Sequence, residues 1–319
     1  AAARETAHDY GEFCRVSLAR GYETAGDGAA LAGHGVRAVV GSVAIEVGDI
    51  FDESDPRENN FLYRLANDLH LSTRESTVRE WLLLQPGELY PAQKAEETAR
   101  ILRERKYLAD AEVAPTSYDP VTNSVDLRVW VRDVGTLEPG VGFGRSGGAN
   151  KSRLRIAEEN LFGLGQKVAL ALKSDQDRSG VSLQFIDPNL FHSFWSLATD
   201  YSDNSDYDSY GVQGGVSKRL VNGWTRRWLA RYRYDRARFT PTTGNGLSTL
   251  ELPEDRLLSY PWVGIELIED DFTTTHNRDQ IGRTEDLFLG RQLRASVGWA
   301  SPAFGSDRSA GIFSLGASI

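Results

Sequence analysis

Two overlapping glycine patterns in one short stretch are the first candidates for chemistry in this chain. Gly144, Ser146 and Gly148 match GxSxG, the pattern around the nucleophilic serine of many hydrolases, while Gly142, Gly144 and Gly147 match GxGxxG, a nucleotide-binding pattern. Both patterns need a helix directly after the glycines, and a hydrolase also needs an acid and a histidine further along. Alternating strand-like sequence lies on both sides of this stretch. The glycines therefore favour a turn between two strands.

Metal ligands are the second candidate. The five histidines show no HxxxH or HxH spacing, which a metal site usually needs as a close pair of ligands; they are His8, His34, His70, His192 and His276. Aspartates 200, 203, 206 and 208 and the run at 268–271 lack the spacing of an EF-hand, so solvated loops are favoured over a calcium site. We expect no metal and no cofactor.

Composition excludes several further classes of protein. Cys14 is the single cysteine, so the chain can form neither an intramolecular disulfide nor a CxxC site. A net charge of -9 argues against nucleic acid as a partner, because binding phosphates requires a concentrated basic patch. No apolar run reaches the roughly 18 residues of a membrane-spanning helix. The chain contains no methionine and opens on AAARE, from which we expect a processed chain whose signal peptide has gone.

The first half of the chain indicates a small α+β layer. Residues 1–35 are expected to be a lead-in or linker. Periodicity then predicts a strand at 39–47, helical runs at 61–71, at 77–84 and after Pro91, and strands at 107–114 and 124–134. We summarise this order as β-α-α-β-β, with two helices covering one face of the sheet.

The second half alternates with a period of two, which is the pattern of strands with one apolar face. Arg231 and Arg233 fall on the face opposite the apolar residues of their strand, and a soluble sandwich would not bury them. An outer-membrane β-barrel, with lipid outside and a polar lumen, fits this pattern, while a soluble β-sandwich or β-propeller is the alternative. The residues that we expect to face lipid are Val168, Leu170, Leu172, Trp195, Leu197, Trp228 and Tyr232.

Specific motifs in both halves resemble known families. The stretch TVREWLLLQPGELYPAQKAEETARILRERKYLADAEV resembles a POTRA domain, the periplasmic module of polypeptide-transport-associated proteins. The segments NLFGLGQ and IDPNLF resemble the first barrel strands of the bacterial surface antigen superfamily, which includes the BamA and TamA assembly factors and the two-partner secretion transporters. The resemblance implies a lead-in at 1–35, a POTRA domain at 36–134 and an antiparallel transmembrane barrel at 135–319.

That barrel is expected to be incomplete. About ten strands can be placed in the sequence after residue 135, whereas the resemblance implies about sixteen, and the chain ends on GASI without the usual terminal aromatic residue. We therefore expect that the chain is truncated after residue 319.

The resemblance also implies a function without a chemical step, so we do not expect an enzyme. The chain is expected to lie in the bacterial outer membrane, with its POTRA domain in the periplasm, and to insert or translocate polypeptides. Unfolded clients would pair with a free edge of the POTRA sheet, for which the candidate residues are Tyr107, Asp110, Glu112 and Val113. Outer-membrane lipid and periplasmic lipoproteins or chaperones are the other expected partners.

Three alternatives stay open. The chain could be the secretion platform of a patatin-like lipase fused upstream, a two-partner secretion transporter, or a soluble β-rich binding protein. For the POTRA edge, the alternative is that residues before Val36 cover it.

Overall fold

A computed structural model describes residues 38–319, except 91, 147–148, 176–178, 191–194, 205–206, 221–222, 240–252, 277 and 279–282. The expected lead-in at 1–35 lies outside the described residues. The chain divides into two compact units. Unit 1 consists of residues 1–135 together with Thr275–Asp286, and unit 2 consists of Thr136–Thr274 and Leu287–Ile319.

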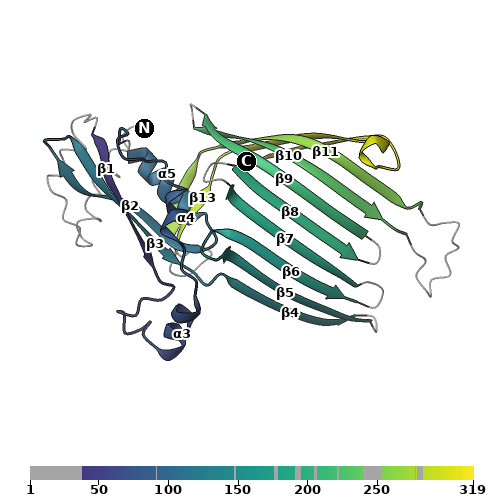
Figure 1. The fold of residues 1–319 in the computed structure, drawn as a ribbon, viewed down its shortest axis with the longest axis horizontal. Helices are drawn as coiled ribbons and strands as arrows, with labels where there is room; N and C mark the ends of the chain where they lie inside the picture. Colours follow the sequence, from purple (N-terminus) through teal and green to yellow (C-terminus); the bar gives the residue numbers. More distant parts are fainter. Residues whose placement is uncertain are drawn as a thin grey trace. The chain divides into compact units, whose positions relative to one another are not determined.

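Unit 1 contains a three-stranded sheet with helices between its first two strands in the chain (Figure 1). The elements are β1 (Val39–Gly48), α3 (Phe61–Leu69), α4 (Glu75–Arg79), α5 (Ala92–Arg103), β2 (Leu108–Asp119) and β3 (Ser124–Asp133). The sheet order is β1-β3-β2, with β1 parallel and β2 antiparallel to the central β3. Each of the three strands expected from the sequence is present.

The core of unit 1 forms between one face of this sheet and the helices. Along β3, Val125, Leu127, Val129 and Val131 are all buried, and the residues between them are half-buried. Ala95, Ala99 and Leu102 make the buried stripe of α5, with the spacing that the sequence predicts. Burying each of the larger side chains contributes roughly 1.5–3 kcal/mol, so this layer accounts for much of the stability of unit 1.

Helix α3 differs from the expectation of two covering helices. Its apolar residues Leu62, Leu65 and Leu69 are spaced as predicted, yet none of its residues is buried. Instead, α3 is held at its start, where the Asn60 side chain accepts a hydrogen bond from the Tyr63 backbone N–H (3.1 Å) and Phe51 stacks on Tyr63 at 4.0 Å. Amphipathic spacing predicted the helix correctly but did not predict that its apolar residues stay exposed.

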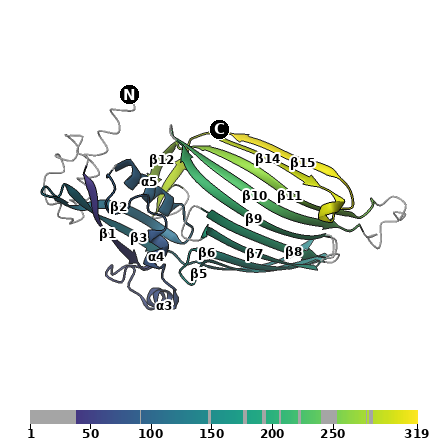
Figure 2. The ribbon, with the colours of Figure 1, turned by 45° about the horizontal axis from the view of Figure 1, so that its top comes forward.

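Unit 2 contains an antiparallel sheet of ten strands in the described part of the chain, in the order β15-β14-β11-β10-β9-β8-β7-β6-β5-β4. Its strands are β4 (Leu137–Ser146), β5 (Ala149–Leu161), β6 (Gln166–Ser174), β7 (Ser179–Leu190), β8 (Trp195–Asn204), β9 (Tyr207–Leu220), β10 (Trp224–Ala237), β11 (Arg256–Glu269), β14 (Gln292–Ala300) and β15 (Ala310–Ser318). The sheet is curved, and a short helix, η2 (Pro302–Phe304), precedes β15 (Figure 2). Two further short strands, β12 (Phe272–His276) and β13 (Thr284–Phe288), pair with each other.

The two near-repeated motifs of the sequence form polar strand ends in unit 2. In NLFGLG, Phe162, Gly163 and Gly165 have positive φ angles of 56°, 73° and 66°, a backbone that glycine adopts easily and phenylalanine rarely. The buried Asn160 side chain accepts from the Gly165 backbone N–H (2.7 Å) and holds this turn. In IDPNLF, the buried Asp187 accepts from the Gln166 side chain (2.8 Å), which ties the second motif to the strand that follows the first.

None of the helices that the structure describes is both long and apolar enough to cross a membrane.

Burial of Tyr107 makes the stability of unit 1 depend on pH in a way that can be tested. Loss of hydration raises the pKa of Tyr107 to about 12. Because the folded state favours the neutral phenol, its contribution to stability is complete below pH 10 and is lost between pH 10 and about 12. A shift of this size corresponds to roughly 3 kcal/mol. Urea denaturation below pH 10 and near pH 12 should show the loss.

Tyr107→Phe should reduce that loss, although it also removes the 3.0 Å bond from the Trp81 indole N–H and should cost about 1 kcal/mol near neutral pH. Tyr118→Phe, in the same sheet, is the control and should leave the alkaline loss in place. An equal alkaline loss in Tyr107→Phe and the wild type would show that another group causes it.

Candidate functional site

Strand β2, which carries the candidate client-binding residues, forms one edge of the unit 1 sheet, since it pairs only with β3 among the described strands. The candidates divide by burial. Tyr107, directly before β2, and Val113 (2% exposed) lie in the core, whereas Asp110 and Glu112 are half-buried. Val113, although a candidate for client binding, therefore offers no apolar side chain at the surface. What remains at this edge for a ligand is mainly the backbone.

The hydrogen bonds of Ala111 indicate which backbone groups of β2 point away from β3. Its N–H donates to the Asp110 carboxylate (2.8 Å) and its C=O accepts from the Arg103 guanidinium (3.1 Å), so both groups bond to side chains instead of to β3. Strand alternation then directs the backbone of Glu112 toward β3 and that of Val113 outward again. Pro115, the next outward residue, has no N–H, as is common on edge strands.

The opposite edge of the sheet is β1, and another segment covers its first part. Val40 donates its N–H to the Glu88 carbonyl (2.8 Å) and accepts from the Gly87 N–H (2.9 Å), while Tyr90 donates to the Ala38 carbonyl (2.8 Å). From Val43 to Gly48, no strand of the described chain other than β3 pairs with β1. Unit 1 thus has two partly open edges, and residues before Val36, which the sequence analysis considered as a cover, lie outside the described residues.

The sheet of unit 2 separates apolar from polar side chains onto two faces. Cross-strand register aligns Val168 with Phe185, and Leu170 with Leu183, on neighbouring strands. Continuing across the sheet, the register places all the expected lipid-facing residues on this one face, and most of them are exposed; they are Val168, Leu170, Leu172, Trp195, Leu197, Trp228 and Tyr232. A continuous exposed apolar face of this kind is typical of surfaces that contact another protein or a membrane.

The other face of the same sheet carries charges that pair across strands. Arg155 bonds to Glu138 (2.9 Å), and Arg231 bonds to Asp200. Sequence reasoning missed Glu266, which is 4% exposed and accepts from Arg227 (2.9 Å) on one neighbouring strand and from Gln292 (2.8 Å) on the other. The only signal in the sequence was that Glu266 alternates with the apolar residues of β11.

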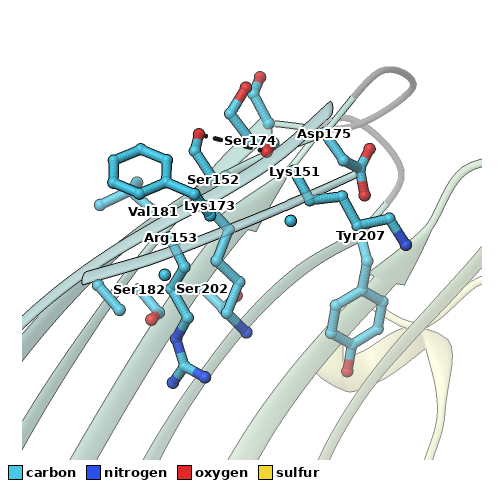
Figure 3. A pocket seen from close by; sticks show the side chains of 16 residues that line it. Lys151, Ser152, Arg153, Lys173, Ser174, Asp175, Val181, Ser182, Ser202 and Tyr207 are labelled. Atoms are coloured by element: carbon cyan, nitrogen blue, oxygen red, sulfur yellow. Dashed lines mark hydrogen bonds between the residues drawn. The ribbon is translucent and has the colours of Figure 1, made fainter. Parts of the chain in front are cut away.

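One end of this polar face is hollowed into an open groove of about 730 Å³. Arg153 and Lys173, directly opposite each other on β5 and β6, extend into it side by side, with Ser182 and Ser202 nearby (Figure 3). Neither cation pairs with a described residue, and glycines on β4 leave Arg153 uncovered. Both side chains are exposed, as solvated cations usually are, so the groove adds to the polar character of this face.

The chemistry-like motifs do not assemble into sites among the described residues. Gly144 and Ser146 belong to β4, which pairs with the antiparallel β5 that follows it, so the helix required by a nucleophilic serine is absent here; Gly147 and Gly148 lie outside the described residues. His70 Nε2–H donates to the buried Asp133 carboxylate (2.9 Å), which also accepts from the Thr73 N–H (2.7 Å).

The remaining candidates give no site either. His276 bonds to Thr284 (3.2 Å). No group of three or more potential metal ligands occurs in the described part of the chain. Cys14, His8, His34, His192 and Asp206 lie outside it.

Comparisons with known proteins find partial matches to this chain. Residues 160–260 match the Omp85 superfamily domain. The outer membrane protein assembly factor BamA of Neorickettsia risticii (strain Illinois) is 23% identical over 157 residues, which cover 46% of this chain and 21% of that protein. This chain therefore spans about a fifth of the length of that curated relative.

Two solved structures are also similar. BamA from Haemophilus ducreyi lacking POTRA domains 1–3 has a TM-score of 0.42 and 15% identity, covering 84% of this chain and 49% of that one. CdiB from Acinetobacter baumannii has a TM-score of 0.47 and 10% identity, covering 88% and 48%.

The outward and inward positions of β2 can be tested with proline. Glu112→Pro should remove a bond to β3 and lower the free energy of unfolding by about 3 kcal/mol. Val113→Pro removes an outward N–H without breaking this ladder, so it should cost less, chiefly through lost packing. Urea denaturation of both variants measures the difference. A smaller loss of unfolding free energy for Glu112→Pro than for Val113→Pro would contradict the assigned backbone direction.

Proposed function

We propose that this chain, whose residues 160–260 match the Omp85 superfamily domain, is an outer-membrane protein that inserts polypeptides into the bacterial outer membrane or moves them across it. The observation that carries this proposal is the two-faced antiparallel sheet of unit 2, together with the β2 edge of unit 1, which pairs with no described strand other than β3.

The two faces of the unit 2 sheet support a position in the membrane. Lipid cannot hydrogen-bond to backbone or charged groups, so strands that cross it must pair their backbones and direct their polar side chains to the lumen. Leu170, Leu183 and Trp228 are exposed on the apolar face, while Arg155 and Glu138 pair on the opposite one. In this proposal the apolar face contacts lipid and the polar face lines a lumen.

Unit 1 is proposed to be the periplasmic POTRA domain, with its boundary near residue 134. It offers a backbone edge at β2, where an extended client can add a strand through main-chain hydrogen bonds. Such pairing requires little of the client sequence, because backbone groups are common to all polypeptides. No covalent step is needed, and Asp110 and Glu112 would adjust the preference for client charge.

The client site can be located with a peptide that copies β6 of this chain, QKVALALKS. Titration into the isotope-labelled full-length chain in detergent should shift the amide signals of Ala111 and Val113 most strongly, because added strands pair there. Shifts confined to Val43–Gly48 would move the site to the β1 edge. Shifts confined to α5, with both edges unchanged, would remove strand addition as the mechanism.

The membrane assignment can be tested with charge on neighbouring positions of one strand. Leu183→Arg places a cation on the apolar face, which should cost roughly 2–4 kcal/mol near the bilayer midplane and reduce membrane assembly. Gln184→Arg, the adjacent residue on the polar face, should be mild. Leu170→Arg, directly opposite Leu183, should repeat the defect. Extraction of membrane fractions with urea measures assembly, and equal defects at 183 and 184 would contradict the assigned faces.

A further inference from the structure

Backbone groups that an added strand would need at the β2 edge are already occupied. The outward N–H of Ala111 bonds to Asp110, and its outward C=O bonds to Arg103. A strand pairing beside β2 at this residue would require both groups, because antiparallel and parallel ladders each bond outward N–H and C=O groups. A client would therefore have to displace Arg103 and Asp110 first.

Arg103 is fixed in this position by a residue from a distant part of the chain. Asp286, on β13, accepts from Arg103 Nε (2.7 Å) and Nη2 (2.8 Å), which leaves Nη1 to donate to Ala111. The arginine side chain is 13% exposed and the aspartate side chain 4% exposed. Bidentate, largely buried pairs of this kind are among the stronger hydrogen-bonded contacts of proteins and orient the guanidinium plane.

Strand β13 also bonds to Asp110, the residue that occupies the N–H of Ala111. Thr284 donates from its hydroxyl to Asp110 (3.2 Å), the residue that bonds the Ala111 N–H. Because Thr284 and Asp286 are two residues apart on β13, they share one face of it. All of these residues belong to unit 1, which includes Thr275–Asp286. We call Arg103, Asp110, Thr284 and Asp286 the edge latch.

We propose that the edge latch is an autoinhibitory contact that closes the β2 edge at Ala111 until a client displaces Arg103. This inference rests on the proposed function of β2, and it adds the regulation of that site. Opening the latch separates Arg103 from Asp286, which frees the Ala111 C=O, and moves Asp110 away from Thr284 and from the Ala111 N–H. The cost of opening favours extended clients that pair over several residues, because a short contact cannot offset the lost ion pair.

Binding of the fluorescent peptide QKVALALKS to the full-length chain in detergent tests the latch. A latch that is closed about nine-tenths of the time lowers the apparent affinity about tenfold. Asp286→Asn, which keeps the side-chain shape and removes the charge, should therefore raise affinity by up to about tenfold in fluorescence anisotropy. Arg103→Met should do the same by a separate route, and Thr284→Val should have a smaller effect in the same direction.

Glu269→Gln is the matched control, because it removes the carboxylate of another bidentate arginine pair, with Arg291 at 2.9 and 3.0 Å, outside unit 1. Its affinity should equal that of the wild type. Adding Val113→Pro to Asp286→Asn should cancel the rise in peptide affinity, because the peptide loses a backbone partner at the β2 edge. This result would place the binding at that edge.

The possible results distinguish failure of the edge latch from failure of the proposed client site. Equal peptide affinity in the wild type, Asp286→Asn and Arg103→Met, with amide shifts at Ala111 in each, would overturn the latch and leave the client site intact. Absence of binding in the wild type and in every latch variant would overturn the client site itself. If Asp286→Asn does not fold, as judged by thermal denaturation, Arg103→Met and Thr284→Val decide the question.

Discussion

The requirement that strand backbones find hydrogen-bond partners underlies most of this structure. Inside each sheet, neighbouring strands meet the requirement, and at the start of β1 the segment around Glu88 does so. At β2 no strand of the described chain pairs with the outer edge, and the side chains of Arg103 and Asp110 bond the outward backbone groups of Ala111 instead. Edge strands invite unintended pairing, so a protein that uses an edge for binding must also control access to it.

Alternation along the strands gives the second level of organisation. In unit 1, β3 directs valines and a leucine to the helices, and the core forms on that side. In unit 2 the same alternation leaves an apolar face exposed, while arginines and carboxylates pair on the other. One geometric rule therefore produces a buried apolar face in one unit and an exposed apolar face in the other. The difference depends on whether helices cover the apolar face.

Local pattern predicted the strands, the helix spacing and the shared face of Val168, Leu170 and Trp228, because these follow from residues close in sequence. It did not predict the backbone direction at Glu112, since a register shift between Leu108 and Asp110 changes which residues face β3. Nor could it reveal that Asp286 bonds Arg103, a residue 183 positions away. The burial of Glu266 likewise depends on β14, which joins β11 only after the intervening β12 and β13.

Because Thr275–Asp286 belongs to unit 1, the order in which the chain is synthesised does not match the order in which its units can be completed. The first 135 residues emerge long before Asp286, so Arg103 must wait for most of unit 2 to be made before it meets its partner. Contacts between residues so distant in sequence form slowly, since a long loop has to close first. Exchanging only residues 1–135 between related proteins would consequently split unit 1, and a hybrid would need the 275–286 segment from the same parent.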